Sequence, residues 1–406
     1  MNNNPQPLLQ PHLRRVRSWF LLAVAVVTLA GQARAQLLGR VDKAFFGLTM
    51  SRSEPQQAWP DVPFGSWRLW DAYVTWAQLE PARGQWDFST LDRLAAEAAE
   101  HRVKPLLVLA HSPAWASARP DERSAYKPGV AAEPARLDDW RNYVRTVGQR
   151  YKGRINEYQV WNEPSDKSHF TGTVAQLVEL TCEAQRILKG IDPAIKLVSA
   201  GSAGGGKHIK YLDDFLARGG AACIDVVAHH FYVPRFGPEA MVPLIREVRQ
   251  VMAKRGVSHL PLWNTETGWW IANTDNTPDH DLVAKGGWRK LDADMEAGAV
   301  IQRAFLLSRA EGVERFYWYA WSNRYGWGLT DGNGKPKPAA QHWNNVFDLI
   351  LDKYVVTCSS GPGADYSCAL RSGSQAVSKV SWRDADSLTR REGPAPSKAG
   401  APAVPQ

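Results

Sequence analysis

Short apolar runs alternate with amphipathic segments along most of the chain. The amphipathic segments repeat apolar residues at helical spacing, as Leu91, Leu94, Ala95 and Ala98 do. They predict helices over 90–101, 138–151, 174–189, 238–255 and 293–310. The apolar runs are rich in β-branched and aromatic residues, as buried strands are. There are eight: 45–50, 67–71, 104–110, 157–163, 196–202, 225–231, 261–266 and 315–321.

Strands that alternate with helices are typical of an α/β protein with a parallel sheet. Eight strands in one continuous stretch favour a closed (β/α)8 TIM barrel over an open doubly wound sheet. The first connection, 51–66, is rich in proline and has no helical period, so we expect the ring of helices to be incomplete. We assign the barrel to residues 36–351.

The alternation ends beyond residue 351. Short β-like runs at 354–358, 367–371 and 376–382, separated by turns, predict a small β appendage over 352–388. The remaining tail, 389–406, has the Pro-, Ala-, Gly- and Ser-rich composition of a disordered segment. Cys358 and Cys368 flank a Gly-Pro-Gly turn, so we expect them to form a disulfide; for Cys182 and Cys223, a bridge and two buried thiols both stay open.

The first 35 residues have the composition of a secretory signal peptide. Arg14, Arg15 and Arg17 precede the apolar run 19–30, and Ala33-Arg34-Ala35 fits a small-x-small cleavage site. The run is too short to cross a hydrocarbon layer of ~30 Å. An uncleaved anchor is the alternative. We expect a periplasmic or secreted protein, in a compartment where disulfides persist; the arginine pair leaves Sec and twin-arginine export open.

Composition narrows the function classes. Hydrophobic residues at 44% and charged residues at 22% exclude wholesale disorder. Removal of the four arginines in residues 1–35 lowers the formal charge from +8 to +4, too little for a nucleic-acid-binding face. No later apolar run predicts a membrane span. The 18 tryptophans outnumber the 12 tyrosines and the 12 phenylalanines, and such flat side chains suit sugars or bases.

Two predicted strands end in a carboxylate. The fourth runs into Trp161-Asn162-Glu163-Pro164 and the seventh into Asn264-Thr265-Glu266. Barrel sites lie at the carboxyl ends of strands, and a buried carboxylate is costly unless it is paired or used. The alternative is that Glu163 and Glu266 are not catalytic and only form ion pairs that cap the two strand ends. Two carboxyls that face each other across a barrel mouth are, however, the minimal equipment for cleaving a glycosidic bond.

The motif Trp161-Asn162-Glu163-Pro164 resembles the acid/base signature of clan A glycoside hydrolases, the 4/7 superfamily. Further motifs agree: the clan's strand-seven nucleophile matches Glu266, its strand-six His-x-Tyr matches His230 to Tyr232, and its strand-two arginine matches Arg68. The resemblance covers about residues 42–350 and is closest to family 39 and related bacterial exopolysaccharide hydrolases.

The resemblance implies a retaining hydrolase in which Glu163 is the acid/base and Glu266 the nucleophile. Asn162 would bond the sugar 2-hydroxyl, Tyr232 would donate to Glu266, and Arg68 would keep Glu266 ionised. His230 would support the site or contact sugar. We also expect the like charge of Glu266 to raise the pKa of Glu163.

Other aromatic and polar groups at strand ends are candidate sugar contacts: His111, Trp115 and Trp321. Tyr317, Trp318 and Tyr319 are interpreted together as core packing. The segment 201–207 has the G-x4-G-K spacing of a phosphate loop, but His208 replaces the Ser or Thr that would bind magnesium. Asp275, Asp279, His280 and Asp281 match no metal-ligand spacing, and no metal or cofactor is expected.

Three functions are therefore weighed. The first is a retaining glycosidase acting within a poly- or oligosaccharide, such as a bacterial exopolysaccharide. The second is an exo-acting β-glycosidase, for example a β-xylosidase, on short saccharides. The third is a non-catalytic sugar-binding barrel in polysaccharide biosynthesis, which the presence of both carboxylates disfavours.

Overall fold

The computed structural model describes residues 38–51, 58–279, 287–322, 327–361, 365–373 and 377–383. The expected signal peptide and tail lie outside these ranges, as do His280 and Asp281. No helix within the described ranges combines the length and apolar character that a membrane crossing requires.

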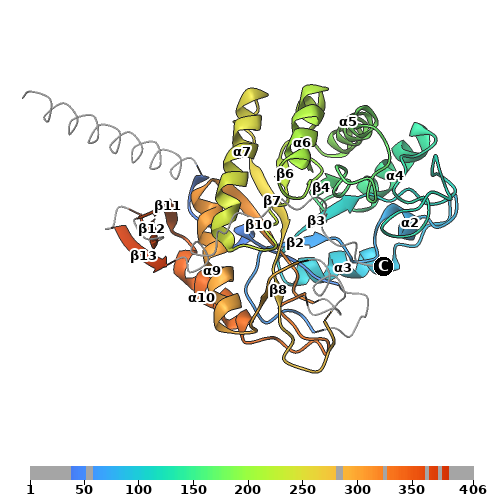
Figure 1. Ribbon diagram of the computed structural model, residues 1–406. Helices are drawn as coiled ribbons and strands as arrows, with labels where there is room; N and C mark the ends of the chain where they lie inside the picture. The colour runs from blue at the N-terminus through green and yellow to red at the C-terminus, as the bar shows by residue number, and fades with distance from the viewer. Residues whose placement is uncertain are drawn as a thin grey trace, which may run out of the picture.

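Eight parallel strands form a nearly closed barrel, which confirms the predicted (β/α)8 fold (Figure 1). Hydrogen-bonded neighbours run in the order β5-β4-β3-β2-β1-β10-β7-β6, and a bridge from Val198 to Val226 joins the two ends. The strands are β1 Phe46–Thr49, β2 Ser66–Leu69, β3 Lys104–Leu109, β4 Glu157–Val160, β5 Lys196–Val198, β6 Val227–His229, β7 Leu262–Thr267 and β10 Val313–Tyr319.

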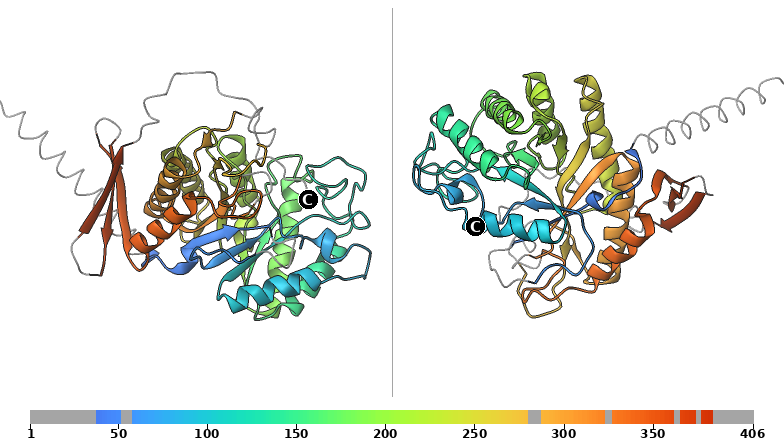
Figure 2. Two further views of the ribbon diagram at one scale, coloured as in Figure 1. Left: turned by 90° about the horizontal axis from the view of Figure 1, so that it is seen from below. Right: turned by 180° about the vertical axis from the view of Figure 1, so that it is seen from behind.

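Helices surround the barrel (Figure 2), and their buried apolar residues belong to the same core cluster as those of the strands. All five predicted helices are present; α2, α6 and α10 were not predicted. Residues 58–65, the described end of the first connection, form no helix, as expected. The helices are α2 Trp76–Leu79, α3 Ser89–Glu100, α4 Leu137–Arg150, α5 Val174–Ile191, α6 Lys207–Ala217, α7 Met241–Lys254, α9 Met295–Ala310 and α10 Ala339–Ile350, with 3-10 turns η1 Lys43–Phe45, η2 Gly220–Cys223 and η3 Pro238–Ala240.

Side chains near the strand starts fill the lower half of the barrel. Trp263 packs there within an apolar cluster, and the Arg315 guanidinium lies 4.1 Å from the centre of its ring. Arg315 also pairs with the buried Glu157 at the start of β4. Because all eight strands are parallel, the polar side chains at the strand ends lie together at the opposite, carboxyl face.

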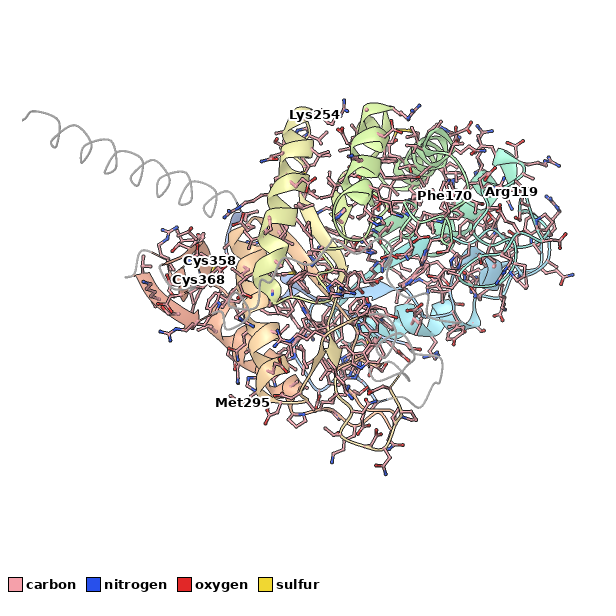
Figure 3. The ribbon with its side chains drawn as sticks, in the orientation of Figure 1. Arg119, Phe170, Lys254, Met295, Cys358 and Cys368 are labelled. Carbon is pink, nitrogen blue, oxygen red and sulfur yellow. A yellow bond between two sulfur atoms is a disulfide. The ribbon has the colours of Figure 1, made fainter. Side chains whose placement is uncertain are left out.

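The appendage is a three-stranded antiparallel sheet of β11 Tyr354–Ser360, β12 Asp365–Arg371 and β13 Val377–Arg383. Cys358 lies opposite Cys368 in its first hairpin, and the two form a disulfide with Cα atoms 4.1 Å apart (Figure 3). The Trp382 indole N–H donates to Glu239 on η3, which ties the sheet to the barrel. A second disulfide, Cys182–Cys223, joins α5 to η2.

Candidate active site

Arg68 on β2 connects three strands at the carboxyl end of the barrel. Its side chain is fully buried, and each of its nitrogens donates a hydrogen bond. Nε donates to Gln159 Oε1 at 2.8 Å, Nη1 to Glu266 Oε2 at 2.6 Å and Nη2 to Asn162 Oδ1 at 2.7 Å. A buried guanidinium is tolerated only when its charge and donors are satisfied in this way. Arg68 therefore fixes the orientation of the carboxylate on β7 and of the amide beyond β4.

Glu266 lies on β7 with a partner on each carboxylate oxygen. Arg68 donates to Oε2, and the Tyr232 hydroxyl donates to Oε1 at 2.9 Å. The side chain of Glu266 is 6% exposed, so these two donors take the place of hydrogen bonds from water. The predicted pairing of Glu266 with Arg68 and Tyr232 is thus present as direct hydrogen bonds.

Glu163 lies three residues beyond the end of β4, not within the strand. Trp161 and Glu163 have φ of 68° and 45°, the left-handed region that non-glycine residues seldom adopt, and this turn aims Glu163 into the barrel mouth. His230 Nδ1 lies 2.9 Å from Glu163 Oε1, and His169 Nε2 lies 3.7 Å from Oε2. The Glu163 amide donates to the Gly201 carbonyl, so the phosphate-loop-like segment supports the site instead.

The protonation of Glu163 is biased by its surroundings. Burial raises the pKa of Glu163, while His169 and Arg68 oppose the shift. The direction agrees with the sequence expectation, but burial is the main cause, and the nearby carboxylate that adds to the shift is Asp166 rather than Glu266. Burial also lowers the pKa of His230 to about 3, so this imidazole is neutral. A neutral ring can accept from a protonated carboxyl or donate to an ionised one.

The two carboxylates and His230 lie close together. One ligand atom from each of Glu163, His230 and Glu266 falls within 4.8 Å of the others. The same trio has the spacing of a metal site. Both oxygens of Glu266 already accept hydrogen bonds, however, and the Arg68 charge repels a cation at that point. The arrangement suits two carboxyls acting on one bond.

An aromatic cluster lies beside Glu163. The His111 ring packs 4.4 Å from Tyr126 and 5.2 Å from Trp70, and Tyr126 packs against His169. Burial lowers the pKa of His111 to about 3, so this histidine is neutral too. His111 is therefore part of the wall next to the acid/base candidate.

The other two candidate sugar contacts, Trp115 and Trp321, have hydrogen-bond partners outside the carboxylate pair. The Trp115 indole N–H donates to the Glu80 carbonyl, and Arg83 covers its ring at 4.4 Å. Trp321 is buried just beyond β10, where its amide donates to Thr49 on β1. Within the described ranges, neither Trp115 nor Trp321 forms a hydrogen bond with Glu163 or Glu266.

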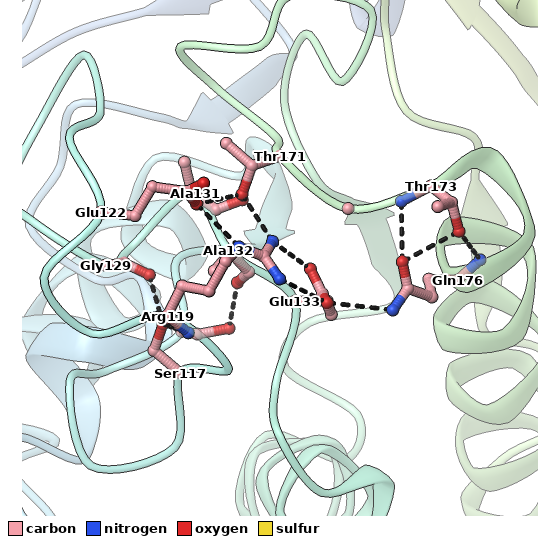
Figure 4. A network of polar contacts seen from close by, with 12 residues as sticks. Ser117, Arg119, Glu122, Gly129, Ala131, Ala132, Glu133, Thr171, Thr173 and Gln176 are labelled. Carbon is pink, nitrogen blue, oxygen red and sulfur yellow. Dashed lines mark hydrogen bonds and ion pairs between the residues drawn. The ribbon is translucent and has the colours of Figure 1, made fainter.

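A polar network holds the loops that carry this wall (Figure 4). Arg119, after β3, donates to both oxygens of Glu133 and to Glu122. Thr171, in the loop after β4, contacts Arg119 and Glu122, and Gln176 on α5 donates to Glu133. The network joins the two loops that carry His111 and His169, and so fixes the aromatic cluster beside Glu163.

Sequence reasoning missed several residues of the site. Gln159 orients Arg68, and His169 flanks Glu163. Tyr319 was assigned to the core together with its neighbours; instead its hydroxyl donates to Asp71 Oδ2 at 2.7 Å beside the carboxylate pair. Asp71 ends an apolar run just as Glu163 and Glu266 do, so the criterion that selected those two applied to it as well.

Comparisons with known proteins agree with this geometry. Residues 71–182 match the model of Glycosyl hydrolase family 10, a stretch that includes Glu163. Among solved structures, a family 39 glycoside hydrolase from Bacteroides cellulosilyticus WH2 matches with 19% identity and a TM-score of 0.60, over 79% of this chain and 65% of that one. A monomeric beta-xylosidase from Caulobacter crescentus CB15 matches with 20% identity and a TM-score of 0.59, over 84% and 76%.

Xylanase 10B from Thermotoga petrophila RKU-1 matches with 16% identity and a TM-score of 0.52, over 78% of this chain and 97% of that one. At such identities the structural likeness is one of fold. The chain spans 65% of the length of the Bacteroides enzyme. Together, the family model and the fold confirm the predicted resemblance to clan A glycoside hydrolases.

Proposed function

We propose that the protein is a retaining clan A glycosidase that cleaves β-glycosidic bonds by double displacement. The observation that carries the proposal is the proximity of the two carboxylates, since one oxygen of Glu163 lies within 4.8 Å of one oxygen of Glu266. Retaining enzymes hold their carboxyls ~5–5.5 Å apart, whereas inverting enzymes need ~6.5–9.5 Å to seat a water molecule. The short separation favours direct attack by one carboxylate on the anomeric carbon.

The surroundings of each carboxylate suit a different role. Glu266, oriented by hydrogen bonds from Arg68 and Tyr232, attacks the anomeric carbon as the glycosidic C–O bond breaks. Glu163, whose pKa is raised by burial, gives its proton to the departing oxygen. In the second step the ionised Glu163 takes a proton from water, and that water displaces Glu266 from the sugar.

Asn162 has the orientation that its proposed sugar contact needs. Its Oδ1 accepts from Arg68, so the amide turns its N–H donors the other way. A hydroxyl on C2 of the sugar gains from such a donor as positive charge develops on the ring. Arg68 thus positions both the nucleophile and the amide.

The substrate that we propose is a poly- or oligosaccharide outside the cytoplasm, for example a bacterial exopolysaccharide. The two disulfides support an oxidising compartment, either the periplasm or the exterior. The similarity to the Caulobacter beta-xylosidase and the Thermotoga xylanase supports the alternative function, an exo-acting β-xylosidase. A non-catalytic sugar-binding barrel would have no use for a carboxylate that accepts from two donors beside a second carboxyl whose pKa is raised by burial.

Stereochemistry tests the proposal. Proton NMR of the first product from a β-linked substrate should show the β-anomer before mutarotation, because two displacements each invert the anomeric centre. Aryl β-glycosides and purified polysaccharides serve as substrates, and mass spectrometry of the products separates endo from exo action. An α-configured first product contradicts double displacement and the role of Glu266.

Gly201 offers a second test. A Cβ at Gly201 would lie 2.3 Å from His230 Nε2 and 2.8 Å from Thr265 Oγ1, far inside contact distance. Gly201→Ala must therefore displace His230 from Glu163 and should lower kcat/KM on aryl β-glycosides ~10–100-fold, since a small misplacement of a catalytic group is costly. Gly190→Ala, on α5 with open space around the new methyl, is the control and should keep full activity. Equal activities of the two variants would show that His230 does not position Glu163.

A further inference from the structure

Asp71 is a third carboxylate at the barrel mouth, two residues beyond β2. The residue is 9% exposed, and its φ of 55° lies in the left-handed region. The Tyr319 hydroxyl donates to Oδ2 at 2.7 Å. The other oxygen, Oδ1, is buried and has no hydrogen-bond partner in the part of the chain that the structure describes. A hydrogen bond thus fixes Oδ2, whereas Oδ1 lacks a donor in the described ranges.

The neighbours of Asp71 are those of the catalytic pair. The charges of Glu266, Arg68 and Glu163 all act on it. The hydrogen bonds that Arg68 forms in the described ranges go to Gln159, Glu266 and Asn162, and none goes to Asp71. Across the described ranges no lysine, arginine or histidine forms an ion pair with Asp71. Burial raises the pKa of Asp71 to about 7, with help from the charges of Glu266 and Glu163 and against the Tyr319 hydroxyl and Arg68.

A purely structural role does not explain this arrangement. A buried polar atom left without a partner costs ~1–3 kcal/mol, and a non-glycine residue in the left-handed region adds of order 1 kcal/mol. A capping aspartate would accept from backbone N–H groups, yet Oδ1 accepts from none in the described ranges. Such costs persist mainly where a ligand supplies the missing partner.

We infer that Asp71 contacts the substrate, its Oδ1 accepting a hydrogen bond from one donor on the sugar ring held next to Glu163 and Glu266. The inference rests on the proposed function. A sugar hydroxyl, or an ammonium in its place, supplies the donor that the protein lacks, and Tyr319 positions the carboxyl to receive it. Asp71 then decides which ring position must carry a donor.

The test replaces Asp71 by glycine, which removes the carboxyl and adopts the same φ without strain. Asp352→Gly is the matched control, because Asp352 has a φ of 58° and is exposed between α10 and β11. Kinetics use 4-nitrophenyl β-glycosides together with derivatives in which single hydroxyls are replaced by hydrogen or by an amino group. Circular dichroism confirms folding of each variant, and Asp71→Asn, also tolerant of this φ, gives a second reading.

Asp71→Gly should lower kcat/KM ~10–100-fold on the parent glycoside, as expected for loss of a hydrogen bond to a charged group. One deoxy-glycoside should be nearly insensitive to the substitution, because it lacks the donor that Asp71 binds. Asp352→Gly should match wild type on every substrate. At the ring position where the deoxy-glycoside is insensitive to Asp71→Gly, the amino and hydroxyl substrates are then compared. If wild type alone prefers the amino substrate, the donor is an ammonium. If wild type prefers the hydroxyl substrate, the donor is a hydroxyl.

Equal losses on all glycosides after Asp71→Gly, or none, overturn the inference while leaving the proposed function intact. Failure of the proposed function looks different. In that case wild type cleaves no glycoside, and Glu163→Gln binds none in calorimetric titration, so both conclusions fall together.

Discussion

Glu266→Ala should abolish turnover, with kcat reduced by at least ~10⁴-fold, the scale on which loss of a covalent nucleophile is felt. The substitution also leaves the buried Arg68 without its carboxylate, and breaking a buried ion pair costs ~3–5 kcal/mol. Arg68 still donates to Gln159 and Asn162, so we expect a folded but less stable variant. Initial rates and thermal unfolding by circular dichroism measure the two effects separately.

A small anion should restore part of this activity. Azide or formate has the charge and size to occupy the space vacated beside Arg68 and Tyr232 and to attack the anomeric carbon of an activated aryl glycoside. A single displacement inverts the centre, so the glycosyl azide from Glu266→Ala should be the α-anomer.

Glu163→Ala is the control for the rescue. There Glu266 still attacks first and azide replaces water in the second step, so the product should be the β-anomer. A β-azide from Glu266→Ala would assign the nucleophile to another residue.

The fold was predictable because its signal is local and repeated. All eight barrel strands follow from apolar runs, and five helices follow from 3.6-residue periodicity. The pattern was also present for α10, whose buried Ala339, Trp343, Val346 and Ile350 share one face. Helix α6 was missed because the glycines before Lys207 favoured a loop.

The site was predictable only in part, since its geometry depends on contacts distant in sequence. Arg68 and Glu266 are 198 residues apart, and only the family resemblance brought them together in advance. The strand assignment placed Glu163 inside β4, because hydrophobicity does not reveal the left-handed turn at Trp161. Tyr319 belongs to an apolar strand, so nothing in its sequence neighbours distinguished a hydroxyl that donates to Asp71 from a core ring.

Glu163→Gln should lose activity to an extent that depends on the leaving group. General acid catalysis contributes ~10²–10⁴-fold, and this should be the drop for an alkyl glycoside or a natural oligosaccharide. A 2,4-dinitrophenyl glycoside needs no proton to depart, so its first step should proceed at nearly the wild-type rate. Pre-steady-state release of dinitrophenolate then gives a burst, followed by slow turnover because the base for water is missing.

The pH profile provides the last test of Glu163. Its proton must be present in the first step, and burial raises its pKa, so wild-type kcat/KM on poor leaving groups should persist above the range of a free glutamate. Activity should then fall as pH rises through that raised value. Glutamine does not titrate, so the residual activity of Glu163→Gln should lack this basic limb. A variant that keeps both the limb and full activity on a natural oligosaccharide would place the general acid elsewhere.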